Sequence, residues 1–139
     1  MMQYFIVIIL LSILGLIAYY VFNLNPSKKT NLKSLYSDGL DLLINGNRRS
    51  AYNNFKEIVE KDSENIKAYL RLGQVLREGD NPGRALKIHK ALLIRKNLSS
   101  FDYMELHKNL SLDYFKLNKI DKAIEEALSI SSELGVAYY

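Results

Sequence analysis

The residue types that most often do chemistry are scarce in this chain. It has two histidines, His89 and His107, and no cysteine. The histidines belong to different segments and lack the spacing of a ligand pair, so the sequence predicts no metal site and no cofactor. Glu125 and Glu126 are neighbours on an expected helix. Their side chains therefore point in different directions and suit a solvated face rather than an acid–base pair.

Two further kinds of catalytic site are not indicated either. The turn GDNPG, residues 79–83, lacks the preceding strand, the Lys and the Ser/Thr of a phosphate-binding loop. The sequence also contains no nucleophile elbow. It therefore predicts a protein that is not an enzyme. The alternative is an unrecognised site that uses His89 or His107.

An internal repeat of 34 residues is the strongest pattern in the sequence. Gly39 recurs as Gly73 and Ala51 as Ala85, and a weaker third copy follows at a spacing of 38, with Ala123. Thirty-four residues is the length of a tetratricopeptide unit, a helix–turn–helix that buries its apolar face only by stacking on its neighbours. The repeat therefore predicts a scaffold that holds other proteins.

We expect an all-α fold with a tetratricopeptide solenoid of about three units over residues 32–139. The repeats are expected at 32–65, 66–99 and 100–135, and their helices at 32–44, 48–61, 66–78, 82–96, 100–117 and 120–134. Small residues should let paired helices approach closely: Gly39, Gly73 and Ser111 on the first helices, and Ala51, Ala85 and Ala123 on the second. Larger residues should fill the core between them: Leu42, Phe55, Ile58, Leu76, Leu92, Tyr114 and Ile130.

The N-terminal part of the sequence carries no charged side chain. Residues 1–27 contain no Asp, Glu, Lys or Arg, and residues 4–22 are apolar or aromatic apart from Ser12 and Gly15. About 20 apolar residues span a bilayer core as a helix. We therefore expect a transmembrane anchor over residues 1–22 and a linker over 23–31. Aromatic residues near the ends of the span would lie at the membrane interfaces: Tyr4, Phe5, Tyr19, Tyr20 and Phe22.

Other interpretations of this segment fit less well. A cleaved signal peptide would need a basic start and a small-residue cleavage site, and a lipoprotein anchor would need a cysteine; the sequence offers none of these. A buried hydrophobic helix is a further alternative. Lys28, Lys29 and Lys33 follow the segment and no basic residue precedes it, so the positive-inside rule puts the C-terminal domain in the cytoplasm. These lysines would face anionic lipid headgroups.

The expected binding surface is the concave groove, which the first helix of each repeat lines. The net charge is +4, but acidic and basic residues are interspersed, so nucleic acid is not an expected partner. The groove has a slight basic excess and suits an acidic peptide or chain terminus. Plain solvated helix faces are the alternative, and a homo-oligomer is left open. The candidate partner-binding residues are Tyr36, Leu40, Lys67, Leu70, Gln74, Arg77, Lys108, Leu112 and Phe115.

The last residues of the sequence, LGVAYY over 134–139, are apolar. Terminal repeats of a solenoid normally need a polar capping face. We therefore expect either that the array continues beyond this segment or that a partner covers it.

The second repeat resembles a known family. Its segment LGQVLREGDNPGRALKIHKALL, residues 72–93, is similar to repeats of the lipopolysaccharide assembly protein B family. Segments around Tyr36, Leu112–Tyr114 and Asp121–Ala123 are also similar, as is the architecture of an N-terminal span followed by repeats. The residues of the second repeat that carry the resemblance are Leu72, Gly73, Leu76, Arg77, Arg84, Ala85, Leu86, Ile88, His89 and Leu92.

This resemblance implies an adaptor in the inner membrane of Gram-negative bacteria, with its repeats in the cytoplasm. Such proteins bring the deacetylase that commits lipid A synthesis to the membrane protease FtsH, and thereby set lipopolysaccharide levels. The family ends in a rubredoxin-like metal domain with paired cysteines, and this chain has no cysteine, so metal binding is not carried over. The alternative is a membrane-anchored, chaperone-like assembly factor that faces the periplasm.

Overall fold

The computed structural model describes residues 2–24 and 31–136 of the chain, with side chains over 4–20 and 31–132. Internal contacts divide the chain into two units, Met1–Asn31 and Leu32–Tyr139. Every secondary-structure element in the described part is a helix, so the predicted all-α class is confirmed there.

The first unit contains one helix, α1 (Met2–Leu24), of 23 residues. Its side chains over residues 4–20 are all exposed, including Tyr4, Phe5, Tyr19 and Tyr20. No helix in residues 2–24 and 31–136 has both the length and the apolar character needed to cross a bilayer. The predicted transmembrane anchor is thus not confirmed. The side chain of Phe22, the lysines Lys28 and Lys29, and most of the expected linker lie outside the described residues.

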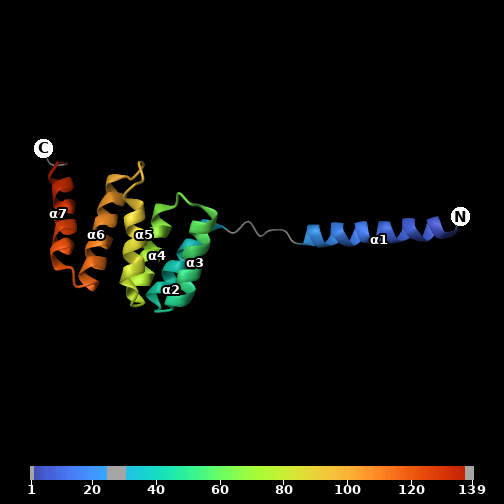
Figure 1. Ribbon diagram of the computed structural model, residues 1–139, viewed down its shortest axis with the longest axis horizontal. Helices are drawn as coiled ribbons and strands as arrows, with labels where there is room; N and C mark the ends of the chain where they lie inside the picture. Colours follow the sequence, from blue (N-terminus) through green and yellow to red (C-terminus); the bar gives the residue numbers. More distant parts are fainter. Residues whose placement is uncertain (1, 25–30, 137–139) are drawn as a thin grey trace. The chain divides into compact units, whose positions relative to one another are not determined.

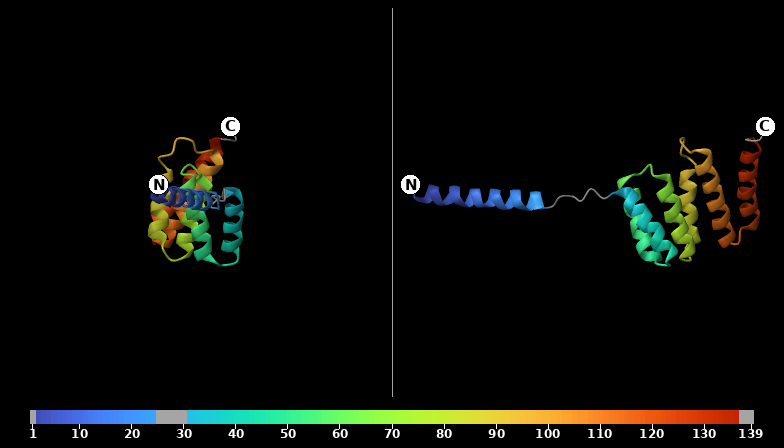
Figure 2. Two further views of the ribbon diagram at one scale, coloured as in Figure 1. Left: turned by 90° about the vertical axis from the view of Figure 1, so that its right-hand side faces the viewer. Right: turned by 180° about the vertical axis from the view of Figure 1, so that it is seen from behind.

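The second unit is a stack of three helix pairs, seen side by side in Figure 1. The pairs are α2 (Leu32–Ile44) with α3 (Arg48–Lys61), α4 (Ile66–Glu78) with α5 (Pro82–Leu92), and α6 (Ser100–Lys116) with α7 (Ile120–Val136). Each helix packs on the next in chain order, and α4 also contacts α6 directly. The view from behind in Figure 2 shows the same layered order. The predicted tetratricopeptide-like arrangement is therefore observed.

The turns between paired helices repeat one hydrogen-bond pattern. Each contains a left-handed residue at the same place in its copy: Gly46 (φ 77°), Asp80 (φ 58°) and Asn118 (φ 56°). The next amide donates back five residues: Asn47 to Leu42, Asn81 to Leu76 and Lys119 to Tyr114, over 2.8, 2.9 and 2.9 Å. This closure satisfies carbonyls that the end of a helix leaves without partners. The turn residues Gly, Asp and Asn are those that tolerate a left-handed backbone.

Three helix ends differ from expectation, the smallest difference being that α6 ends at Lys116 rather than Leu117. Helix α5 ends at Leu92 rather than near Lys96. Beyond it the chain turns so that Arg95 pairs with Glu64 at 3.0 Å and its guanidinium lies 5.2 Å from the centre of the Tyr69 ring. These contacts, on the loop before α4 and on α4 itself, stabilise the turn in place of further helix. Helix α7 continues to Val136, two residues past the expected end.

The extra residues of the third repeat lengthen its first helix, α6. Helix α6 has 17 residues, whereas α2 and α4 have 13 each. Ser99 caps its start, since its hydroxyl accepts a hydrogen bond from the Asp102 amide at 3.1 Å. The expected extra turn of this helix is confirmed and lies at its N-terminal end.

Small residues do bring the paired helices together. A Cβ atom on Gly39 would lie 2.9 Å from the ring of Phe55, and one on Gly73 would overlap the ring of His89. Phe55 and His89 occupy the same position in repeats one and two. The hydroxyl of Ser111 donates to the Ala123 carbonyl at 2.8 Å, which is the third version of this approach. The core positions Ala51, Ala85 and Ala123 are buried as expected.

We predict that Gly73→Ala destabilises the domain. The added methyl cannot fit without displacing the buried His89 ring, and overpacking of this kind costs about 1–3 kcal/mol. Gly83→Ala is the matched control, because nothing lies within 4 Å of its Cβ position. Urea unfolding followed by circular dichroism measures both. Equal stability of the two variants would contradict the close packing of His89 on Gly73.

Candidate protein-binding groove

The Asp113 carboxylate on α6 is a fully buried polar group of the domain. Its side chain is 0% exposed. One oxygen accepts a hydrogen bond from Arg77 Nη1 of α4 at 2.9 Å, and the other lies 2.5 Å from His89 Nδ1 of α5. Arg77 also donates to the Asn109 side-chain oxygen at 3.1 Å. The cluster joins repeats two and three.

His89 lies between two acceptors. Its Nδ1 faces the Asp113 carboxylate, and its Nε2 is 3.2 Å from the Leu70 carbonyl oxygen. A carbonyl can only accept, so Nε2 carries the proton of that hydrogen bond, while Nδ1 faces the carboxylate. The carboxylate of Asp113 is therefore held between the Arg77 guanidinium and the His89 ring.

We call the contact between repeats one and two the first junction and that between repeats two and three the second. At the first junction, apolar residues occupy the positions of this cluster. Arg77, His89 and Asp113 correspond to Leu43, Phe55 and Val75 in the repeat alignment. Phe55 and Val75 belong to the buried cluster of the first junction, and Leu43 packs against that cluster. Neighbouring repeats are thus held together by hydrophobic contact at the first junction and by a buried ion cluster at the second.

Histidine reactivity is not supported by the surroundings of either ring. His107 Nδ1 lies 2.6 Å from Glu126 Oε2, and its Nε2 is buried without a hydrogen-bond partner. His107 packs on the Tyr103 ring, with ring centres 4.1 Å apart. Among the described residues no group of three or more potential ligands could hold a metal ion. His89 of α5 contacts α4 and α6, and His107 of α6 contacts α7, so both rings contribute to helix packing.

We predict that Asp113→Asn destabilises the domain by about 3–5 kcal/mol, because it leaves the buried Arg77 guanidinium without its counter-ion and His89 without its carboxylate partner. The exposed pair Lys56–Glu60 supplies the control, Glu60→Gln, with an expected loss of about 0–1 kcal/mol.

A triple variant separates lost charge balance from lost packing. Replacing the cluster by the residues of the first junction, R77L/H89F/D113V, should restore stability to near the starting value, since apolar replacement of a whole buried ion group is often neutral. Thermal and urea unfolding measure all three variants. A triple variant that is as unstable as Asp113→Asn would contradict the equivalence of the two junctions.

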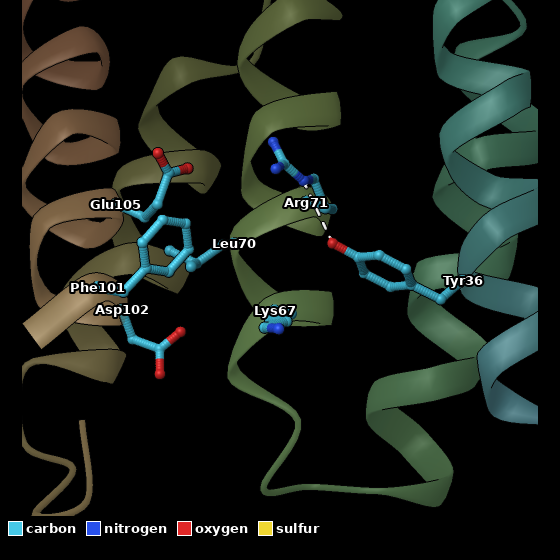
Figure 3. Close-up of a pocket in the computed structure, with 7 residues that line it drawn as sticks. All are labelled: Tyr36, Lys67, Leu70, Arg71, Phe101, Asp102 and Glu105. Atoms are coloured by element: carbon cyan, nitrogen blue, oxygen red, sulfur yellow. Dashed lines mark hydrogen bonds between the residues drawn. The ribbon is translucent and has the colours of Figure 1, made fainter. Parts of the chain in front are cut away.

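On the other side of α4 the first helices of the three repeats form a pocket. Its volume is about 200 Å³, and it opens between α2, α4 and α6. Figure 3 shows Tyr36 pointing from α2 toward Arg71 of α4, and Phe101 of α6 pointing toward the α4 side that carries Leu70. The residues that line it are Tyr36, Lys67, Leu70, Arg71, Phe101, Asp102 and Glu105.

Hydrogen bonds hold the central arginine of this pocket. Arg71 Nη1 donates to Gln74 Oε1 at 2.7 Å, and Arg71 Nε donates to the Tyr36 hydroxyl at 3.4 Å. Gln74 in turn donates to Glu78 at 2.8 Å. The guanidinium is therefore oriented before any partner arrives, although no carboxylate pairs with it directly in the described part of the chain.

The structure separates the nine candidate residues of the groove into several groups. Tyr36, Lys67 and Leu70 line the pocket, and Gln74 supports it through Arg71. Leu40 packs against the core of the first junction, and Lys108 is exposed and pairs with Glu105 at 3.0 Å. Arg77 is a correction: its guanidinium points into the buried cluster with Asp113, so it cannot serve a ligand in the groove.

Leu112 and Phe115 lie elsewhere. They border a second hollow of about 430 Å³ between α6 and α7, and Phe115 is 62% exposed. The remaining lining of this hollow is almost entirely apolar: Ser111, Ile120, Ala123, Ile124 and Ala127. An apolar surface therefore lies on α6 and α7, in the last repeat. The side chains of 134–139, which the sequence predicts to form an apolar end, lie outside the described residues.

Three pocket residues are not expected in the groove from the sequence: Arg71, Phe101 and Asp102. Phe101 and Asp102 lie in the extra N-terminal turn of α6, which has no counterpart in α2 or α4. The repeat pattern assigns no groove position to residues of an inserted turn. The signal that was available is the change of spacing from 34 to 38, which places new residues at the groove end of this helix.

Comparison with known proteins agrees with this fold. No family model matches the chain. It is similar to lipopolysaccharide assembly protein B of Escherichia coli K12, with 25% identity over 88 residues, which are 63% of this chain and 23% of the relative. The proteins of that name from the CFT073 and O157:H7 strains match to the same extent. The resemblance inferred from the second repeat is thus confirmed, over less than a quarter of the relatives' length.

The solved structures include a similar fold. The crystal structure of MamA superposes with a TM-score of 0.62 and 23% sequence identity, covering 84% of this chain and 71% of that one. This likeness supports the fold, a stack of paired helices.

Proposed function

We propose that this protein is a non-catalytic scaffold that binds a segment of a partner protein in the pocket between α2, α4 and α6. The observation that supports this proposal is the pocket itself, where three successive repeats place Tyr36, Arg71 and Phe101 around one opening. Phe101 is 61% exposed, and a large exposed aromatic side chain beside oriented polar groups is typical of a protein-binding surface.

A finer proposal draws on the similarity to lipopolysaccharide assembly protein B. In this version the chain is an adaptor that regulates lipopolysaccharide synthesis by bringing the lipid A deacetylase to the FtsH protease. The match to that protein spans 88 residues, 63% of this chain. The alternative is a generic assembly factor of the same fold on the other side of the membrane.

Attachment to a membrane belongs to the same proposal. Helix α1 carries no charged residue and exposes apolar side chains over the whole of residues 4–20. Such a surface gains about 25 cal/mol for each Å² of apolar area that it transfers from water to lipid. The lysines that follow would place the repeats on the cytoplasmic face of a bacterial inner membrane.

Photo-crosslinking tests the site. With benzoylphenylalanine in place of Phe101, we expect covalent capture of a partner protein in intact cells. The same group in place of Lys87, exposed on α5 away from the pocket, should capture little. Mass spectrometry identifies the product. Recovery of FtsH or the deacetylase supports the finer version, and recovery of neither would remove it. Equal capture at both positions would refute the groove.

Membrane attachment has its own test. In cell lysates washed with alkaline carbonate, the full chain should stay with the membrane pellet, because α1 offers a charge-free apolar surface to lipid. A variant that lacks residues 2–24 should move to the supernatant. Immunoblotting of the two fractions measures this. Release of the full chain by carbonate would contradict a lipid-embedded α1.

A further inference from the structure

The pocket is lined by two cations and two carboxylates that do not pair with one another within the described residues. Both acids are already occupied: Glu105 pairs with Lys108 at 3.0 Å, and Asp102 accepts from the Ser99 hydroxyl at 2.6 Å. The two cations, Lys67 and Arg71, have no carboxylate partner within the described residues. They are one helical turn apart on α4, so both present their charge to the same opening. These two cations are therefore the groups of the pocket that an anionic ligand would pair with.

Apolar surface lies next to this cationic site. Leu70 of α4 and Phe101 of α6 line the part of the pocket toward α6, whereas Tyr36 and Arg71 line the part toward α2 (Figure 3). A ligand that fills the pocket therefore needs an anionic group for one part and an apolar group for the other.

Helix spacing sets the separation of these two groups. Neighbouring packed helices lie about 8–10 Å apart, and an extended peptide advances about 3.3 Å per residue. An anionic and an apolar side chain on one extended segment would thus reach the two parts of the pocket when they are about two or three residues apart.

We propose that the pocket recognises an extended peptide segment in which an acidic residue is followed or preceded, two or three positions away, by a large apolar residue. This inference rests on the proposed scaffold function and names its ligand class. A carboxylate fits better than a phosphate, because the acidic wall formed by Asp102 and Glu105 would repel a second negative charge.

Fluorescence anisotropy with the full chain in non-ionic detergent tests this ligand class. The probe is a labelled glycine–serine peptide with one aspartate and, three positions on, one phenylalanine. We expect saturable binding that weakens about tenfold when serine replaces the aspartate, and similarly when serine replaces the phenylalanine. A phosphoserine version and inorganic phosphate as competitor should bind more weakly than the aspartate peptide. Tighter binding of either would overturn the carboxylate assignment.

Matched variants locate the binding. K67Q/R71Q removes both pocket cations and should weaken binding about tenfold. K87Q/K90Q removes the same charge from α5, outside the pocket, and should change it less than about twofold. Circular dichroism confirms that both variants fold. Equal weakening by the two pairs, or no saturable binding of the aspartate peptide, would overturn the inference. If crosslinking at position 101 still captures a partner, the scaffold function stands and only its ligand class fails.

Discussion

The buried carboxylate of Asp113 is the constraint on which the rest of the domain depends. Leaving a carboxylate in a dry interior is unfavourable unless cations and hydrogen bonds surround it. Arg77 and His89 supply them from two different helices, so α4, α5 and α6 can satisfy the group only in one relative placement. Hydrophobic contact alone tolerates small sliding. A three-part ionic contact with fixed distances does not, and it therefore defines how the second and third repeats meet.

The binding pocket uses the same helices from their other side. Leu70 shows the connection most directly: its carbonyl accepts from His89 inside the junction, while its side chain lines the pocket. Arg77 and Arg71 lie on the same helix, one held in the buried cluster and one offered to the groove. A rigid junction keeps the two pocket walls at a constant separation, so a partner would meet a preformed surface with little ordering cost.

The repeating parts of this structure are predictable from the sequence. The spacing of Gly39 and Gly73 predicted close helix pairs, and the helices of the first repeat have the predicted bounds. The parts that break the repeat were not recovered. Asp113 replaces Val75 at an equivalent position, and nothing in a helical pattern says that its carboxylate points inward, since that depends on Arg77 and His89 meeting it in space. A pattern reports the periodicity of one helix and not which charges three helices bring together.

The two unlike junctions also give the array a direction and an order. The surface that holds Asp113 presents Arg77 and His89 from two helices, whereas the surface that holds Val75 is apolar. If the third repeat stacked on the first, its carboxylate would be buried against Leu43 and Phe55 with no counter-charge. Such a misassembled or domain-swapped stack is therefore strongly disfavoured. Near-identical repeats would be interchangeable, but the contact surfaces of these repeats differ, so each surface fits one partner surface.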